Sequence, residues 1–324
     1  MFEPSVPISG ETVAEIVQLS DFDQARLVFR NWQGQLEQLS CGRFEGVLRI
    51  VCGRVVRVVE VEANQRVLIR GHDAAKHLAV YPVTTGNAMS LWQGRLLAPG
   101  QLVVNGADTE VDHCSALKTR DLGLSIDPVA LNEASRILLG SAAQVVPHGW
   151  AVYDPTPEAL LSFRNQLNHL LFIGSKVPSI WPTTEGHQLE QDCIRSLVEL
   201  LFSASTRKPH SSLRARARVV DRAEDYLRSQ LDGSVGVIDL CRELAISDRT
   251  LRLAFNERFG LGPMAYYKCL RLNAVRSRLK AGPRIEIAEV ARRHGFYHLG
   301  NFAADYRRLF GEQPSATRRR PLLQ

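Results

Sequence analysis

The chain has 324 residues, of which 45% are hydrophobic and 23% are charged. This composition is typical of a folded globular protein and excludes a disordered or collagen-like chain, and the length allows two domains with a core each. No segment approaches the roughly 18 consecutive apolar residues that cross a bilayer. The first residues also lack the basic start and apolar stretch of a secretory signal. We therefore expect a cytoplasmic protein.

Charge is divided unevenly along the chain, whose net charge is +6. Residues 211–324 hold 22 Lys and Arg against 12 Asp and Glu, a balance of +10, whereas residues 1–210 hold 18 against 22, a balance of −4. Of the 40 basic residues, 34 are Arg, whose guanidinium can hold a phosphate or a guanine edge through two donors. This asymmetry indicates a nucleic acid or an anionic membrane as partner of the C-terminal part.

The cysteines are scattered and form no Cys-x-x-Cys pair, lying at positions 41, 52, 114, 193, 241 and 269. A disulfide framework is typical of short secreted chains, and a zinc site needs clustered ligands. We therefore expect buried free thiols and no metal.

Residues 34–126 have the pattern of a β-rich domain, with short runs of Val, Ile and Leu separated by Gly, Asn, Asp and Pro. Some runs alternate, as in Val56-Arg57-Val58, which predicts a sheet with one face in water. The expected architecture is a β-sandwich or a small barrel. From residue 127 the apolar period becomes helical, and we predict helices over 127–139, 156–173 and 185–203.

The segment 203–212 is polar, small and broken by Pro209, which predicts a linker. Everything after it is predicted to be helical. The fold class is therefore α+β, with a sandwich or barrel-like domain and its helices over residues 1–205 and an all-α domain over residues 206–324.

The C-terminal region contains an internal repeat, which sets the interpretation of the chain. Two series of residues recur 51 positions apart, namely Leu251, Phe255, Phe259, Gly260 and Pro263, and Phe302, Tyr306, Phe310, Gly311 and Pro314.

Each copy of the repeat predicts two helices joined by a tight turn. A short helix, 238–245 or 286–294, ends at a small residue that lets the chain turn sharply. In the first copy Ser247 can cap the next helix, whose apolar stripe stops at a glycine. A helix pair with a basic, amphipathic second helix is a helix-turn-helix. A purely structural helix pair is the alternative, and two copies in a region of charge +10 argue against it.

Residues 263–280 predict a rigid helix between the two copies, which begins at Pro263 and stops before Gly282-Pro283. At ~1.5 Å per residue this helix spans ~27 Å, close to the ~34 Å pitch of B-DNA. It can therefore place two recognition helices in successive turns of the major groove.

The C-terminal region resembles the DNA-binding domain of the AraC/XylS family of bacterial transcription regulators. The residues that carry the resemblance are the runs IDLCRELAISDRTLRLAFNERFGLGPMAYYKCLRLNAVRSRLK and IAEVARRHGFYHLGNFAADYRRLFGEQPSATRR. It implies seven helices with two helix-turn-helix units, and a sequence-specific DNA-binding regulator, which we expect to be an activator with double-stranded DNA and RNA polymerase as partners.

The two recognition helices differ in the side chains that they offer. Aligned through Leu251 and Phe302, the first copy exposes long polar residues that can reach bases, and the second places Gly300, Asn301 and Ala303 at the same positions. The predicted DNA-binding residues are Ser247, Arg249, Thr250, Arg252, His298, Asn301, Arg307 and Arg308. We expect the first copy to read bases and the second to hold phosphates, chiefly through Arg307 and Arg308.

The N-terminal part resembles the family's sensing and dimerisation domains, which implies a small-molecule effector. The stretch QLSCGRFEGVL (38–48), after Trp32, resembles the ethanolamine-operon-regulator type, and no effector-binding residues are assigned. The Leu stripes of 156–173 and 185–203 are either core or a homodimer interface, and we expect at least one helix to serve a homodimer.

An enzyme is the alternative from another class. A metal-dependent β-barrel of the cupin type needs His-x-His with a nearby Glu and a later His, and the histidines at 72, 77 and 113 do not have this spacing. The dispersed cysteines cannot form the four-cysteine zinc site of an alkyl-acceptor domain, and no nucleophile-elbow motif is present. We expect no catalytic residues, no cofactor and no metal.

Overall fold

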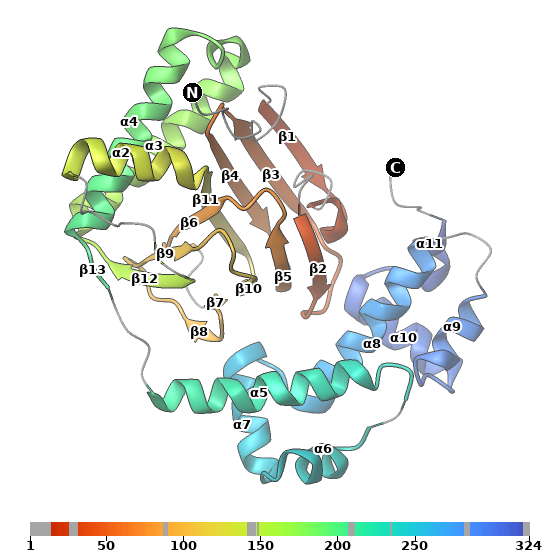
Figure 1. Ribbon diagram of the computed structural model, residues 1–324. Coiled ribbons are helices and arrows are strands. Elements are labelled where there is room, and N and C mark those ends of the chain that lie inside the picture. The colour runs from red at the N-terminus through yellow and green to blue at the C-terminus, as the bar shows by residue number, and fades with distance from the viewer. Residues whose placement is uncertain are drawn as a thin grey trace.

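The computed structural model describes residues 14–25, 32–86, 90–140, 147, 149–206, 211–233, 235–281 and 286–319. Two antiparallel sheets and three helices form the N-terminal part, and the remaining helices pack beside one of the sheets (Figure 1). The fold class is therefore α+β, as the sequence predicts. No described helix is both long enough and apolar enough to cross a membrane.

The larger sheet has eight strands in the order β1-β3-β4-β11-β6-β9-β12-β13. Its strands are β1 (Ala14–Leu19), β3 (Gly46–Cys52), β4 (Val56–Ala63), β6 (Leu78–Pro82), β9 (Leu102–Asn105), β11 (Thr119–Ile126), β12 (Trp150–Asp154) and β13 (Ser205–Thr206). The outer strands β1 and β13 do not pair with each other, so the sheet is open rather than a closed barrel. Three of its strands, β1, β12 and β13, lie outside the region predicted to be β-rich.

The smaller sheet has five strands in the order β2-β5-β10-β7-β8. Its strands are β2 (Trp32–Gln38), β5 (Val67–Asp73), β7 (Leu91–Trp92), β8 (Arg95–Leu96) and β10 (Val111–Cys114). A short 3-10 turn, η1 (Phe22–Gln24), precedes it in the chain. The two sheets form a sandwich.

Three helices cover the outer face of the larger sheet (Figure 1): α2 (Pro128–Leu139), α3 (Pro157–Lys176) and α4 (Thr184–Ser203), with a 3-10 turn η2 (Pro178–Ile180) before α4. The predicted starts of the first two are confirmed, because Asp127 caps α2 and Thr156 caps α3. Most of their Leu side chains are buried in one core with β4 and β11. The Leu stripes therefore serve mainly as core.

The expectation of a water-facing sheet surface at Val56-Arg57-Val58 is wrong. Val56 and Val58 pack under the helices, and Arg57 is only 5% exposed because its side of β4 lines the interior between the sheets. A polar side chain that enters an interior cavity produces the same alternation as one that faces solvent, so the pattern could not distinguish them.

Seven helices follow in the described C-terminal residues, as the family resemblance implies. They are α5 (Ser211–Ser229), α6 (Val237–Leu244), α7 (Asp248–Phe259), α8 (Pro263–Lys280), α9 (Ile287–Arg293), α10 (Leu299–Phe310) and α11 (Pro314–Arg318). The predicted linker is shorter than expected, since Ser205–Thr206 pair with β12 and α5 begins at Ser211. Pro209, Gly282 and Pro283 lie outside the described residues.

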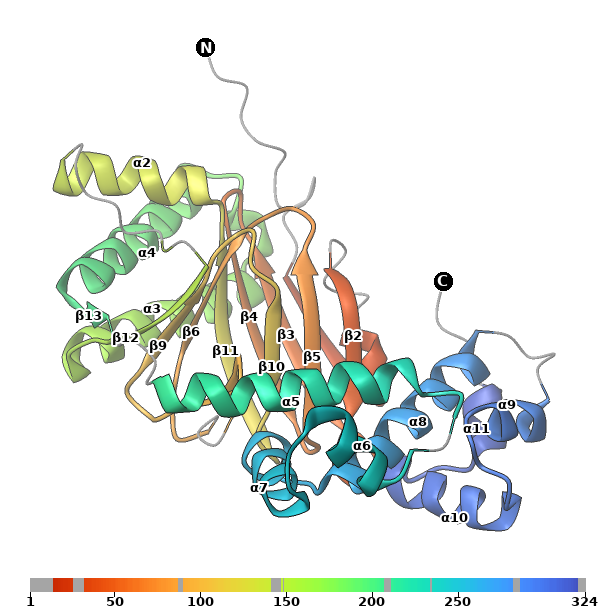
Figure 2. The same cartoon turned by 60° about the horizontal axis from the view of Figure 1, so that its bottom comes forward.

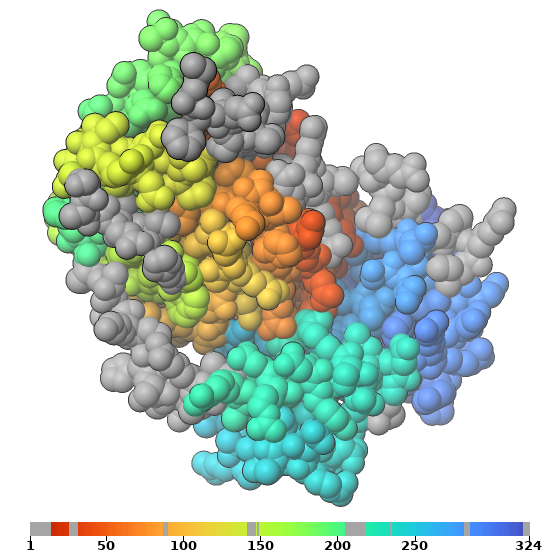
Figure 3. All heavy atoms as spheres, in the orientation of Figure 1, coloured from red at the N-terminus to blue at the C-terminus, as the bar shows by residue number. Residues whose placement is uncertain are grey.

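Figure 2 shows α8 between the two helix pairs, with α6 and α7 on one side and α9 and α10 on the other. In Figure 3 the C-terminal helices lie directly against the N-terminal strands. The structure thus joins two helix-turn-helix units through one helix and seats both on the smaller sheet and its flanking turns.

Candidate nucleic-acid interface and ligand cavity

The first helix-turn-helix unit is formed by α6 and α7, and its predicted reading residues lie at the start of α7. Ala245 turns the chain with a left-handed φ of 55°, and Ser247 caps α7 by accepting a hydrogen bond from the Thr250 amide at 3.2 Å. The side chains of Arg249, Thr250 and Arg252 are exposed. The face predicted to read bases is therefore open to solvent.

The two arginines of this face are held differently. The Nε of Arg252 donates to both carboxylate oxygens of Asp248 at 2.8 Å, which orients its guanidinium and leaves the terminal nitrogens outward. Arg249 pairs with no described residue. The Ser247 and Thr250 hydroxyls lie 2.9 Å apart, so both contribute to the helix start before any ligand binds.

The second unit is formed by α9 and α10 and offers fewer donors. Gly295 turns the chain with a φ of 75°, and His298 supplies no side-chain hydrogen bond to cap α10. His298, Gly300 and Asn301 are exposed, and Ala303 is half-buried. Uncapped backbone amides at a helix start suit an anion such as phosphate.

Arg307 and Arg308 lie near the other end of α10, with exposed side chains. Arg308 donates to Asp305 at 2.9 Å, and its backbone carbonyl accepts from the Gly42 amide at 3.0 Å. The two arginines thus lie beside the contact with the N-terminal part.

Both recognition helices end at a glycine in the left-handed region, Gly260 with φ +67° and Gly311 with φ +68°. A Cβ on Gly311 would lie 2.6 Å from the backbone nitrogen of Arg43. Glycine is therefore required here both by backbone conformation and by the close approach of the N-terminal part.

These two helix ends are docked in the same way. The Phe259 carbonyl at the end of α7 accepts from Nη1 of Arg66 at 2.8 Å. The Leu309 carbonyl at the end of α10 accepts from the Gly42 amide at 3.1 Å and from Nε2 of Gln38 at 2.7 Å. The internal repeat is therefore matched by a repeated contact with the N-terminal part.

A buried ionic network ties the first unit to the smaller sheet. Glu224 of α5 is 1% exposed and accepts from Nη2 of Arg70 at 2.6 Å, and Arg228 donates to Glu37 at 2.6 Å. Burial raises the pKa of Glu224, but the charges and hydrogen bonds of Arg70 and Arg228 outweigh it, so that this pKa is lowered overall.

A second network holds the connecting helix α8. Arg276 contacts Asp21 at 2.6 Å and Asp23 at 2.9 Å, and Lys280 contacts Asp23 at 2.8 Å. The Arg276 guanidinium also lies 4.6 Å from the ring centre of Phe22. Burial raises the pKa of Asp21, but Arg276 and Lys280 outweigh it and lower that pKa overall.

Some of the basic residues that the sequence analysis attributed to binding a nucleic acid or membrane take part in these contacts instead. Arg228, Arg258, Arg276 and Lys280 all pair with carboxylates of the N-terminal part, Arg258 with Asp112. The charge asymmetry therefore serves domain docking as well as any external anion.

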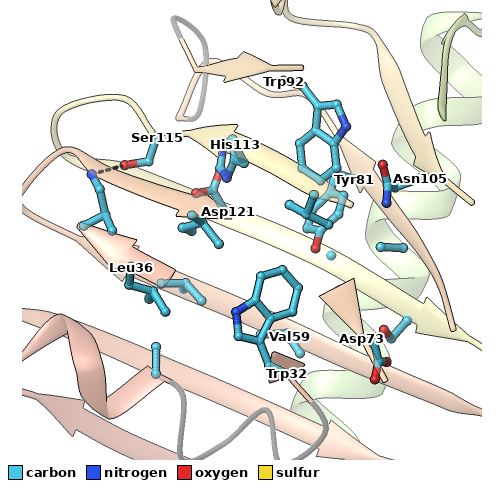
Figure 4. Close-up of a pocket in the computed structure, with 18 of the residues that line it drawn as sticks. Trp32, Leu36, Val59, Asp73, Tyr81, Trp92, Asn105, His113, Ser115 and Asp121 are labelled. Carbon is cyan, nitrogen blue, oxygen red and sulfur yellow. Dashed lines mark hydrogen bonds between the residues drawn. The ribbon is translucent and has the colours of Figure 1, made fainter. Parts of the chain in front are cut away.

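A cavity of about 160 Å³ lies between the two sheets (Figure 4). Its walls are mainly apolar, with the aromatic rings of Trp32, Tyr81 and Trp92 among them. Tyr81 packs against Trp92 in a tilted arrangement, with 4.7 Å between ring centres. A small apolar cavity with a few polar groups is typical of a ligand site.

Polar side chains enter this cavity from several strands. Asp73 accepts from the His77 ring at 2.7 Å, and Asp121 accepts from the Thr119 hydroxyl at 3.1 Å. Burial raises the pKa of Asp73, but the hydrogen bonds from His77 and the Ala75 amide lower it overall. The cavity thus holds charge within an apolar wall.

The smaller sheet separates the cavity from the first helix-turn-helix unit. On β10, His113 lines the cavity, whereas its neighbours Asp112 and Cys114 face the C-terminal helices. On β5, Ile69 lines the cavity and Leu68 packs into the core of α5 and α7. Because side chains alternate along a strand, these strands present one face to the cavity and the other to α5 and α7.

The three histidines considered for a metal site each have different neighbours. His77 pairs with Asp73, the His113 ring lies tilted against Trp92 with 5.3 Å between ring centres, and His72 lies at the outer side of β5. Across the ranges that the structure describes, no three His, Cys, Asp or Glu side chains gather as a metal would need. The cysteines are free, and the expectation of buried thiols is met by Cys52, Cys114 and Cys193, whereas Cys241 and Cys269 are half-buried and Cys41 is exposed.

Sequence reasoning assigned no effector-binding residues, and the structure shows a cavity whose lining residues the sequence analysis did not bring together. Trp32, Tyr81, Trp92 and Asp121 come from four strands of two sheets. The aromatic residues in and next to the β-rich region were the signal in the sequence that could have indicated such a cavity. Their convergence depends on the strand order, which periodicity does not reveal.

A family model described as a helix-turn-helix domain matches residues 240–320. The chain is 35% identical over 99 residues to the probable thc operon regulatory protein of Rhodococcus erythropolis, covering 30% of each. It is 36% identical over 129 residues to XylDLEGF operon transcriptional activator 3 of Pseudomonas putida, covering 38% of this chain and 37% of that one. These alignments span about a third of the length of the curated relatives.

Among solved structures, a probable AraC family transcriptional regulator from Rhodopseudomonas palustris is 33% identical to this chain. The match covers 32% of this chain and 95% of that chain, with a TM-score of 0.30.

Proposed function

The chain belongs to the AraC/XylS family of regulators, and from this premise we propose that it is a sequence-specific DNA-binding activator of transcription that responds to a small-molecule effector. Residues 206–324 bind DNA, and residues 1–205 sense the effector and dimerise. The observation that carries the proposal is the pair of helix-turn-helix units joined by α8, each with an exposed recognition-helix start.

In this proposal the two units have different tasks. Arg249 and Arg252 read bases. Ser247 and Thr250 fix the start of α7 and contact the sugar-phosphate backbone of the DNA. In the second unit His298 and Asn301 contact the edge of a base, and Arg307 and Arg308 bind phosphates. The exposure of these side chains and the ion pair that orients Arg252 support the assignment.

The effector binds in the cavity between the sheets and acts through the smaller sheet. Support comes from the alternation on β10, where His113 faces the cavity and Asp112 holds Arg258 of α7. A ligand that moves β10 changes the position of the first unit relative to the second. The effector is released unaltered, since the domain acts as a sensor and not as an enzyme.

A homodimer and RNA polymerase are the proposed macromolecular partners besides DNA. Exposed apolar side chains on the helices that cover the larger sheet support a dimer surface: Ile137, Leu138, Leu161, Phe172 and Phe202. The names of the curated relatives as transcriptional activators support contact with RNA polymerase.

The test is binding of the full chain to a pool of random duplexes, followed by sequencing of the bound fraction. We expect enrichment of a motif with two parts about one helical turn apart, ~34 Å. Binding without any sequence enrichment would contradict a sequence-specific regulator.

A further inference from the structure

The volume of the cavity suits a ligand of about one ring. The cavity measures about 160 Å³, and an apolar protein cavity of about 150 Å³ is known to hold benzene. Its aromatic rings, Trp92, Tyr81 and Trp32, come from strands of both sheets (Figure 4). The Tyr81 ring is seated against Gly123 of β11, where a Cβ would lie 2.7 Å from the ring.

The two carboxylates in the cavity wall are not equivalent. Asp73 is compensated, because His77 binds it at 2.7 Å and the nearby charge of Arg57 lowers its pKa along with the hydrogen bonds. Asp121 has only the Thr119 hydroxyl as a hydrogen-bond partner, at 3.1 Å, and pairs with no cation among the described residues. Asp121 is therefore a carboxyl group in a mainly apolar wall that has no cationic partner among the described residues.

The groups around Asp121 do not supply the missing positive charge. His113 stands beside Asp121 in Figure 4, and burial lowers the pKa of His113 despite the nearby Asp121 and Asp112 carboxylates. Tyr81 is buried, and burial together with the charges of Asp121 and Asp73 raises its pKa. Both neighbours are thus neutral near pH 7.

We propose that the effector is a small organic cation, an amine carried on an apolar body of about one ring, with Asp121 as its counter-ion and the rings of Trp92, Tyr81 and Trp32 around it. This rests on the proposed function, since it names the effector class of the same cavity. A carboxylate pairs with the ammonium group, and aromatic faces attract a cation that has lost its water. A ligand anion would meet Asp121 directly and would have to compete with Asp73 for Arg57.

The test compares three probes of one size and different charge at pH 7: benzylamine, benzyl alcohol and benzoate. Binding to the full chain is measured by calorimetry and by quenching of tryptophan fluorescence. We expect benzylamine to bind at least ~10-fold more tightly than the other two, a difference of about 1.4 kcal/mol.

Four variants locate the charge that selects the ligand. Asp121→Asn should remove the preference for benzylamine while benzyl alcohol binds as before, and Asp121→Glu should retain part of it. Thr119→Val removes the hydroxyl partner and keeps the carboxylate, so the preference should remain. Asp73→Asn is the matched control, because that carboxylate is already paired.

Three outcomes would overturn the proposal: benzoate binding as tightly as benzylamine, an unchanged preference in Asp121→Asn, or no saturable binding of any probe. Binding of the same preparation to its selected DNA motif is measured in parallel. Loss of sequence-specific DNA binding with intact amine binding would instead reject the regulator function and leave the ligand class standing.

Discussion

The two helix-turn-helix units share a sequence pattern and differ in what surrounds them. The first contacts the smaller sheet through buried ion pairs, such as Arg258 with Asp112 and, through α5, Glu224 with Arg70. The second contacts the N-terminal part at its recognition helix through the backbone of Gly42 and the amide of Gln38. Both units thus contact elements that line the cavity, the first through buried ion pairs and the second through Gln38 of β2 and through apolar side chains such as Phe44 and Val67.

The unit that is held by buried ion pairs also carries the long donors. Arg249 and Arg252 project from α7, whereas Gly300 and Ala303 occupy the matching positions of α10. From this difference we expect a division of labour in which the first unit reads bases and the second supplies general affinity.

The largest expected effect concerns salt. Between 50 and 200 mM salt, DNA affinity of the full chain should fall by roughly 10³–10⁵, provided that about 6–10 phosphates are contacted. If the second unit holds phosphates, Arg307→Ala with Arg308→Ala should reduce the slope of log affinity against log salt by about 2. Arg249→Ala with Arg252→Ala should change this slope less. Equal slopes in both double variants would remove the distinction between the units.

The next effect concerns docking of the first unit. Asp112→Asn leaves Arg258, which is 5% exposed, without its anion, and breaking such a buried pair costs roughly 3 kcal/mol. Amide hydrogen exchange should accelerate by about 100-fold in α5–α7 and much less in α9–α10.

The matched variant is Gln38→Met, which removes the donor to the Leu309 carbonyl at the end of α10. Exchange should then accelerate in α10 and not in α7. Simultaneous loosening of both units in either variant would show that they move as one body.

A smaller effect concerns pH. The pKa values of Glu224 and Asp21 are lowered from 4.5 and 3.8 by their basic partners. A carboxyl with a lowered pKa stabilises docking in full above its ordinary pKa, and this stabilisation is lost as the pH falls through the lowered value. Docking of α5 and α8 should therefore weaken below about pH 4.

The backbone contact of Gly42 with α10 has no titrating group and should persist over the same range. Exchange rates corrected for intrinsic pH dependence, measured from pH 3 to 7, would check this. Weaker docking of α5 at pH 7 than at pH 4 would contradict the sign.

Local chemistry predicted the elements well. Asp127, Thr156 and Ser247 marked helix starts that the structure confirms, and the 51-residue repeat located both helix-turn-helix units. These features depend on neighbours within one turn of the chain, which a single sequence contains.

Long-range features were not predictable from periodicity. The division of the strands into two sheets, the cavity and the Arg276 pairing with Asp21 across more than 250 residues depend on strand order and docking. Arg57 illustrates the limit, because a polar residue that faces an interior cavity has the same pattern as one that faces water.

The most direct test of this division of labour is a binding-site selection on three full-length proteins: wild type, Arg249→Ala with Arg252→Ala, and His298→Ala with Asn301→Ala. Loss of a bidentate arginine contact should cost ~1–3 kcal/mol at its base pair. We expect the first double variant to lose base preference in one half of the selected motif, and the second to retain most of the wild-type motif. The opposite pattern, with preference lost in the His298 and Asn301 variant alone, would show that the second unit is the main reader.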